Sequence, residues 1–202
     1  ALHHVGSNNP DGIEIKQNKD KEGIPKDGIP FHPYFTIKDS VVVVGFLWIF
    51  CAVVFYAPAL NGYFLEAPNF IEANPLKTPE HIAPLWYLTP YYSVLRAIPP
   101  LFGSQFPGVL GMFAALGVFF LLPWLDRSPV KSIRYRSPIY KWILGVFVLS
   151  FIVLGWLGVQ PVTPLYVLMA RIFTILYFSF FILMPWFSTL GKTKEVPERV
   201  TG

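Results

Sequence analysis

Four long runs without a charged side chain constrain this chain more than any other feature of its sequence. They cover residues 40–65, 97–125, 142–170 and 172–191, and each has at least 20 residues. A helix of about that length crosses the ~30 Å of hydrocarbon in a membrane. Only 14% of the 202 residues are charged, whereas a soluble domain has about 25%. The sequence therefore predicts a membrane protein rather than a soluble helical domain.

Prolines flank two of these runs, as expected of residues that interrupt helical hydrogen bonding. Pro138 and Pro161 bracket the third expected span, and Pro164 and Pro185 bracket the fourth. We predict an all-α membrane protein with a large outer loop, residues 61–106, that carries short helices. The four transmembrane helices are expected at about residues 40–60, 107–125, 139–160 and 165–185.

The positive charges outside these helices predict the orientation. Residues 1–39 carry five lysines and residues 126–141 carry five lysines and arginines, whereas the long loop has only Lys77 and Arg96. By the positive-inside rule, both chain ends and residues 126–141 face the cytoplasm or its equivalent. The net charge of +4 reflects this topology and is no argument for nucleic-acid binding.

The expected organisation has three parts. Residues 1–39 form a loop on the cytoplasmic side, residues 40–191 form the transmembrane domain, and residues 192–202 form a polar tail. The first residue is alanine, and the missing initiator Met favours a piece cut from a longer protein over a separate subunit.

Common catalytic and metal-binding motifs are absent from the sequence. It has no glycine-rich phosphate loop, no His-Glu-x-x-His motif and no serine nucleophile elbow. Cys51 is the one cysteine, which excludes an intrachain disulfide. The four histidines, His3, His4, His32 and His81, are scattered over both expected sides. A metal site made by this chain alone is therefore not expected.

The most unusual segment of the long loop is HIAPLWYLTPYYSVLRAIPP, residues 81–100. Its tyrosines and tryptophan are compatible with an interfacial aromatic belt. A belt does not explain the repeated prolines, which stiffen the backbone. A preformed pocket for a flat apolar ligand needs such rigidity, and both interpretations remain open on composition alone.

Two charged residues have alternative explanations. Asp39, followed by Ser40, is a residue type that commonly caps a helix N-terminus. It also forms a cluster of polar side chains with His32 and Lys38 at the expected membrane edge. Arg171 is the one charge inside the fourth span. It either extends to the membrane surface or pairs with a partner.

Three stretches together resemble one family: LHHVGSNNP at 2–10, PFHPYFTIKD at 30–39 and NPLKTPEHIAPLWYLTPYYSVLRAIP at 74–99. They are similar to the second half of cytochrome b, the membrane core of quinol–cytochrome c oxidoreductase, respiratory complex III. Residues 122–136 and 171–185 resemble its bacterial forms in particular. The resemblance implies the last four helices of an eight-helix protein. The GSNNP loop and the fourth helix favour the respiratory branch over the photosynthetic subunit IV.

This resemblance implies cofactors and partners. The cofactors are quinone or quinol, such as ubiquinol, and two b-type haems whose axial histidines lie outside this segment. The partners are the N-terminal haem-binding half of cytochrome b, the Rieske iron–sulfur protein, cytochrome c1 and membrane lipid, in a homodimeric complex. The implied location is the bacterial inner membrane rather than the mitochondrial one.

The family's quinone-reducing site on the inner side uses the residues that match His3, Ser7, Lys38 and Asp39. A quinone that accepts two electrons also needs two protons, which a histidine and a carboxylate can deliver from water. By resemblance, His3 and Asp39 are the catalytic residues there. Lys38 is expected to hold Asp39 ionised or to relay its proton.

On the outer side, PLWY at 84–87 stands where the family has Pro-Glu-Trp-Tyr at the quinol-oxidising site. Tyr87 is the expected catalytic residue. The family's glutamate is Leu85 here, and leucine cannot take a proton from quinol. Either Glu80 or His81 replaces it, or no carboxylate from this motif is required, which is our hypothesis. The residues expected to line the site are Ile82, Pro84, Leu85, Tyr87, Leu88 and Tyr92.

The resemblance thus predicts a part of the subunit that oxidises quinol and passes electrons toward cytochrome c, with proton translocation. Two alternatives remain. The chain is a non-catalytic scaffold or transporter fragment, or it is the separate C-terminal subunit of a split cytochrome b. Inverted repeats or spans broken in the middle would favour a transporter, and the sequence gives no sign of either.

Overall fold

The computed structural model describes residues 9–13, 15, 18–62, 64–65, 67–77 and 82–199. The chain divides into two compact units, Glu14–Glu80 and a second one made of Ala1–Ile13 with His81–Gly202. The described residues of both units form helices and no β-strand. The all-α prediction is therefore confirmed.

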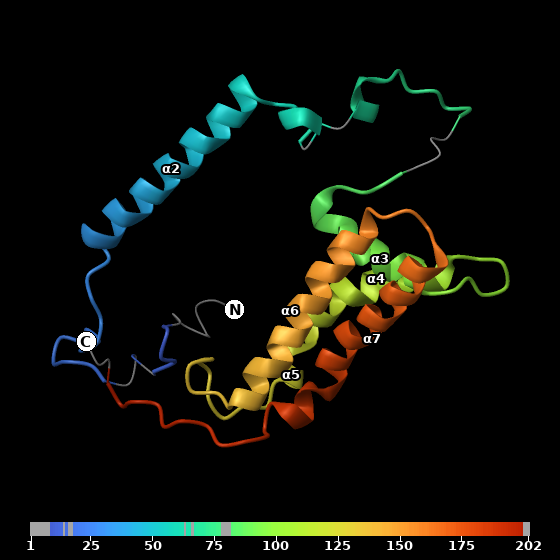
Figure 1. Ribbon diagram of the computed structural model, residues 1–202. Helices are drawn as coiled ribbons and strands as arrows, with labels where there is room; N and C mark the ends of the chain where they lie inside the picture. The colour runs from blue at the N-terminus through green and yellow to red at the C-terminus, as the bar shows by residue number, and fades with distance from the viewer. Residues whose placement is uncertain are drawn as a thin grey trace. The chain divides into compact units, whose positions relative to one another are not determined.

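Four helical segments are long and apolar enough to cross a membrane, as the sequence predicts (Figure 1). The first unit contributes α2 (Tyr34–Tyr56), and the second contributes α6 (Pro138–Gly158) and α7 (Pro164–Phe187). The remaining span, Phe106–Leu125, is not one continuous α-helix. It consists of α4 (Phe106–Gly117), the 3₁₀ turn η5 (Val118–Leu121) and α5 (Leu122–Leu125).

Side chains and prolines fix the starts of the last two spans. Ser137 and Thr163 are the N-cap residues of α6 and α7, and each side chain accepts a hydrogen bond from a backbone N–H in the first turn. A proline follows each cap, where its missing N–H costs nothing. Pro185 does not end α7 as expected, because the helix continues to Phe187. So close to the helix end, the proline removes only one backbone hydrogen bond.

The first span begins earlier than the sequence suggests. Helix α2 starts at Tyr34 after Pro33, so Asp39 lies inside the helix rather than at its N-cap. The interpretation of Asp39 as a capping residue is therefore wrong. Ser40 is inside the helix as well, and its hydroxyl donates to the carbonyl of Thr36 at 2.8 Å.

The long loop between the first two spans carries short helices, as predicted. The first unit contains the 3₁₀ helices η2 (Leu60–Gly62) and η3 (Ala67–Phe70). The second unit contains η4 (Trp86–Leu88) and the α-helix α3 (Thr89–Ala97). Helix α3 packs against α4, α6 and α7, and Figure 1 shows it behind α6.

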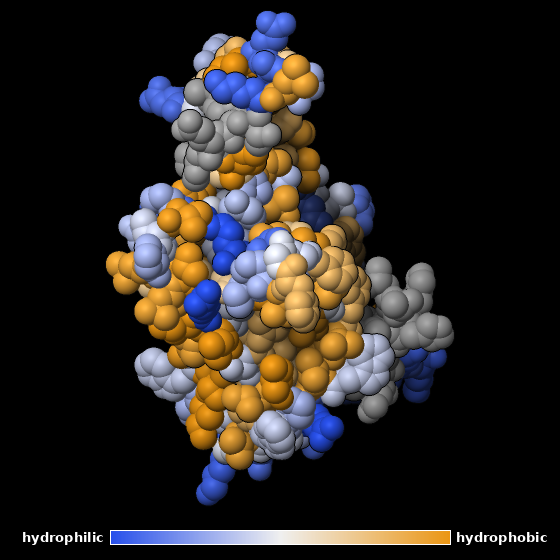
Figure 2. Space-filling view, turned by 90° about the vertical axis from the view of Figure 1, so that its right-hand side faces the viewer, coloured by the Kyte–Doolittle hydropathy of each residue, from blue (hydrophilic) through white to orange (hydrophobic). Residues whose placement is uncertain are grey.

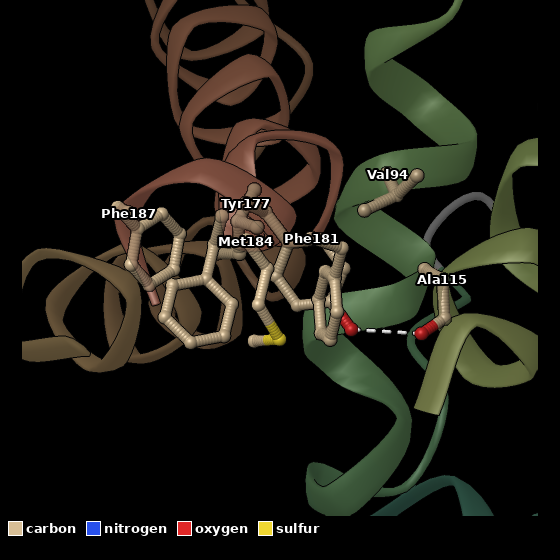
Figure 3. Packing of buried hydrophobic residues seen from close by; sticks show 8 residues of the cluster. Val94, Ala115, Tyr177, Phe181, Met184 and Phe187 are labelled. Carbon is tan, nitrogen blue, oxygen red and sulfur yellow. Dashed lines mark hydrogen bonds between the residues drawn. The ribbon is translucent and has the colours of Figure 1, made fainter. Parts of the chain in front are cut away.

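Aromatic side chains of α7 dominate the core of the second unit (Figure 3). The Tyr177 hydroxyl donates to the carbonyl of Ala115 in α4 at 2.7 Å. The rings of Phe147 in α6 and Phe180 in α7 stack with their centroids 4.3 Å apart. The buried members of this core are Val94, Ala115, Leu154, Tyr177, Phe180, Phe181, Met184 and Phe187.

Large apolar side chains also cover much of the surface, as the face in Figure 2 shows. Helix α2 has no buried residue, and from Val41 to its end it is apolar all round. Trp142 and Ile152 of α6 and Leu165 of α7 are exposed as well. Such surfaces suit a helix that faces lipid or another membrane helix.

Close approach of α3 and α6 requires a glycine. A Cβ placed on Gly158 would overlap the backbone carbonyl and the Cβ of Thr89, whereas one on Gly145 of the same helix would meet no atom within 4 Å. Backbone atoms cannot move aside as a flexible side chain can. The first turn of α3 is therefore seated on α6 at Gly158.

We expect Gly158→Ala to destabilise the second unit by about 1–3 kcal/mol, the usual cost of overpacking. Gly145→Ala is the matched control and should leave stability unchanged or slightly raised. Thermal unfolding of the detergent-purified protein measures both. Equal melting temperatures for the two variants would show that α3 is not seated as described.

Candidate functional site

Residues 82–88 form the first part of the candidate site. Leu85, with φ of −54° and ψ of 148°, is the residue before the 3₁₀ turn η4. The turn closes through a hydrogen bond from the Leu88 N–H to the Leu85 carbonyl at 2.8 Å. The Thr89 hydroxyl donates to the Trp86 carbonyl at 2.7 Å. These bonds join the PLWY motif directly to the start of α3.

Polar side chains fix α3 against α6. The buried Ser93 hydroxyl donates to the Leu154 carbonyl at 2.5 Å. Arg96 Nη1 donates to the carbonyls of Gln160 at 3.0 Å and Gly158 at 3.4 Å. The last carbonyls of a helix lack partners within it, so Arg96 satisfies the C-terminus of α6.

The C-terminus of α3 is satisfied in the same way. Gln105 Nε2 donates to the carbonyls of Leu95 at 2.9 Å and Ile98 at 3.2 Å. Arg171 Nε of α7 donates to the carbonyl of Ala97 at 3.0 Å. Helix α3 is therefore fixed at both ends and presents residues 82–88 on a rigid support.

The side chains expected to line the site lie on this one segment. Leu85 is 55% exposed and Tyr87 51% exposed, and the Tyr87 ring meets the Trp86 ring edge to face at 5.6 Å. Among the described residues, nothing accepts or donates a hydrogen bond at the Tyr87 hydroxyl. Ile82 and Leu88 are also exposed and Pro84 is half-buried. An apolar wall with one available hydroxyl results.

The two neighbouring tyrosines of α3 have different surroundings. Tyr92 is half-buried and lies under the Arg96 guanidinium, 5.5 Å from its ring centroid. Tyr91 packs edge to face on Phe151 of α6 at 5.8 Å. Burial raises the pKa of Tyr91 above its ordinary value, so this hydroxyl stays protonated at neutral pH. Tyr91 therefore belongs to the packing, whereas the half-buried Tyr92 contacts Arg96.

The possible replacements for the family's glutamate, Glu80 and His81, lie outside the described residues. Leu85 itself offers only carbon atoms at its position. The described part of the 82–92 segment contains no carboxylate. Its chemistry is therefore apolar and aromatic, with phenolic hydroxyls as the polar groups.

The second candidate site is only partly described. His3 and Ser7 lie outside the described residues, whereas Lys38 and Asp39 lie on the exposed second turn of α2. Lys38 Nζ lies over the Tyr34 ring, 4.9 Å from its centroid. No described residue forms an ion pair with Asp39, and the expected role of Lys38 toward this carboxylate stays a prediction. Asp39 is available to a ligand or to water.

Residues 126–136 are tied together by ion pairs. Arg136 Nη2 contacts Asp126 Oδ2 at 2.7 Å, and its guanidinium lies over the Tyr140 ring at 4.4 Å. Asp11 pairs with Arg134 at 3.0 Å and accepts a hydrogen bond from the Tyr135 hydroxyl at 2.9 Å. That hydrogen bond raises the pKa of Tyr135 above its ordinary value. These contacts fix the loop between the second and third spans.

Within the described residues, no group of three or more His, Cys, Asp or Glu side chains could hold a metal ion. His32 bonds instead to a neighbour, with Nδ1 3.2 Å from the Thr36 hydroxyl oxygen. The described part of the chain thus offers no cluster of ligands for a haem iron or another metal.

Sequence reasoning missed the residues that position the wall. These side chains donate hydrogen bonds to backbone carbonyls of α6, of the residues after it, or of the end of α3. The donors are Ser93, Arg96 and Gln105. The partners of Ser93 and Arg96 are more than 60 positions away in the sequence. Only one signal was available, the placement of a lone arginine in an apolar loop segment.

The comparisons with known proteins agree with the resemblance seen in the sequence. The family model described as "Cytochrome b(C-terminal)/b6/petD" matches residues 72–178. Cytochrome b of Allochromatium vinosum is 62% identical over 205 residues, which cover 100% of this chain and 50% of that protein. Cytochrome b of Rhodospirillum rubrum is 43% identical and covers 100% of this chain and 46% of that protein.

A solved structure titled "Hyperthermophilic respiratory Complex III" is also similar, with a TM-score of 0.77 and 42% identity. The match covers 92% of this chain and 44% of that one. The chain thus spans about half the length of the curated relatives it matches. Because the family model matches more than half of the chain and the relatives align along all of it, the chain is an integral membrane protein that belongs to the cytochrome b C-terminal family.

Proposed function

We propose that this chain is the C-terminal part of the quinol-oxidising subunit of a respiratory complex III, in a bacterial inner membrane. The observation that carries the proposal is the exposed wall at residues 82–88, fixed by α3. A flat apolar headgroup fits beside Ile82, Leu85 and Leu88, and the Tyr87 hydroxyl can bond one of its oxygens. The family membership and the similarity to a complex III structure support this assignment.

In this proposal the 82–92 segment faces the outer side and binds quinol next to the Rieske iron–sulfur protein. Oxidation of quinol releases two electrons and two protons. One electron goes to the iron–sulfur protein and on to cytochrome c1. The b-type haems, which the N-terminal half would hold, would supply the path for the other electron. This chain's part is to position quinol and to exclude water from one side of it.

On the inner side, quinone would be reduced beside Asp39, with His3, Ser7 and Lys38. Reduction by two electrons needs two protons from water. An exposed carboxylate with no protein partner among the described residues suits proton transfer, because its proton exchanges readily with solvent. The roles of His3 and Ser7 in this site are taken from the family resemblance.

The first test concerns the missing glutamate. We expect Leu85→Glu to leave quinol-driven reduction of cytochrome c by the purified complex within about tenfold of wild type at pH 7. A carboxylate that acts as the limiting base would add about 10²-fold or more. Leu85→Gln is the matched control, because glutamine has the same shape as glutamate and carries no charge. A larger rise in Leu85→Glu but not in Leu85→Gln would show that a carboxylate is limiting.

The second test concerns Asp39. We expect Asp39→Asn to slow b-haem reoxidation from the inner side by about 10²-fold, the usual size of a lost proton donor. Quinol oxidation on the outer side should be unchanged in the first turnover. Stopped-flow spectroscopy of the b-haem band separates the two steps. Glu22→Gln, in the same unit, is the control, and unchanged kinetics in Asp39→Asn would remove Asp39 from the site.

A further inference from the structure

Arg171 is a charged residue in an apolar span, and the proposed function uses only its Nε, which holds the C-terminus of α3. It lies seven residues after Pro164, the first residue of α7, or about 10 Å along the helix axis. Its side chain is exposed on the surface of the second unit. A charged group at this depth is costly unless it is paired or reaches the membrane surface.

The hydrogen bonds of Arg171 use only part of its guanidinium. Nε donates to the Ala97 carbonyl at the end of α3 at 3.0 Å. The four N–H groups on the two Nη atoms remain. Of the residues that the structure describes, none accepts a hydrogen bond from them or forms an ion pair with them. The planar edge of the guanidinium suits two oxygens of one anion.

A hollow of about 320 Å³ lies beside this guanidinium. Thr174, one turn further along α7, borders the hollow, and its buried hydroxyl oxygen has no hydrogen-bond partner among the described residues. A buried hydroxyl that bonds nothing costs about 1–3 kcal/mol, so it favours an acceptor supplied from elsewhere. The remaining lining is apolar: Ala97, Ile98, Pro99 and Ile175.

We propose that this hollow binds a membrane phospholipid, with the phosphate on the Nη edge of Arg171 and an ester oxygen at the Thr174 hydroxyl. The acyl chain would lie along Ile98, Pro99 and Ile175. Helical side chains tilt toward the helix N-terminus. Arg171 therefore extends toward the membrane surface at the Pro164 end, where phosphates are located.

A lipid fits better than an acidic side chain of a neighbouring helix. A carboxylate brought to this depth would bear its own desolvation cost, whereas every lipid leaflet supplies phosphates at its surface. The apolar lining also suits a hydrocarbon chain and offers nothing polar beyond Arg171 and Thr174. The site is separate from residues 82–88 and from Asp39, and lipid occupancy can be measured without quinol.

Native mass spectrometry of the purified, detergent-washed complex tests the proposal, with dioleoyl phosphatidylglycerol as the probe. We expect the wild-type complex to bind one more lipid per copy of this chain than the Arg171→Gln variant. The wild type should reach half-saturation at about tenfold lower lipid concentration, because the variant loses a charged hydrogen bond. Thr174→Val should also weaken binding. Ser179→Ala, elsewhere on α7, is the control and should bind like wild type.

Two measurements keep the proposal testable even if Arg171→Gln unfolds. Thr174→Val removes a hydroxyl that has no partner among the described residues, so the variant should fold at least as stably as wild type. Its lipid binding therefore decides. Dioleoylglycerol, which lacks the phosphate, should bind wild type much more weakly than the phospholipid does. The proposal is wrong if both lipids bind equally or if Thr174→Val binds the phospholipid like wild type. It is also wrong if wild type binds no additional phospholipid because another group is bound at the Nη atoms of Arg171.

Discussion

The candidate site depends on hydrogen bonds from side chains to the backbone carbonyls of neighbouring helices. Helix α3 has only nine residues, too few for a stable helix on its own. Ser93 and Arg96 bind it to α6, and Arg171 binds its C-terminus to α7. Each such bond in a membrane contributes about 0.6–2 kcal/mol. Together they turn a short loop helix into the support of residues 82–88.

The same packing explains the small residues of the third span. Lipid tails are as apolar as the helices, so burial of apolar surface gives little drive for association. Close contact between helix backbones must stabilise the association instead. Gly158 lets Thr89 approach the backbone of α6, and Gly155 lies beside Pro90. Pro90 thus serves packing and rigidity at once, which an interfacial aromatic belt alone would not require.

The four spans could be predicted because the absence of charge over 20 residues is a local property of the sequence. The start of α2 was missed because residues 34–39 contain Lys38 and Asp39, which a charge-free criterion excludes. The role of α3 could not be predicted, since the partners of Ser93, Arg96 and Arg171 lie 61 to 74 positions away. The wall itself was predictable because PLWY is contiguous.

The replacement of a carboxylate by Leu85 changes what the wall can do. With leucine, the exposed side chains at 82, 85 and 88 are all aliphatic, so they add no desolvation cost when an apolar ring covers them. A glutamate at the same place would need a partner once water is excluded. In the proposed function, binding then rests on apolar contact and on the Tyr87 hydroxyl. The proton of quinol must then leave through water, through Glu80 or His81, or through a group of another subunit, which places the control of proton release outside the PLWY motif.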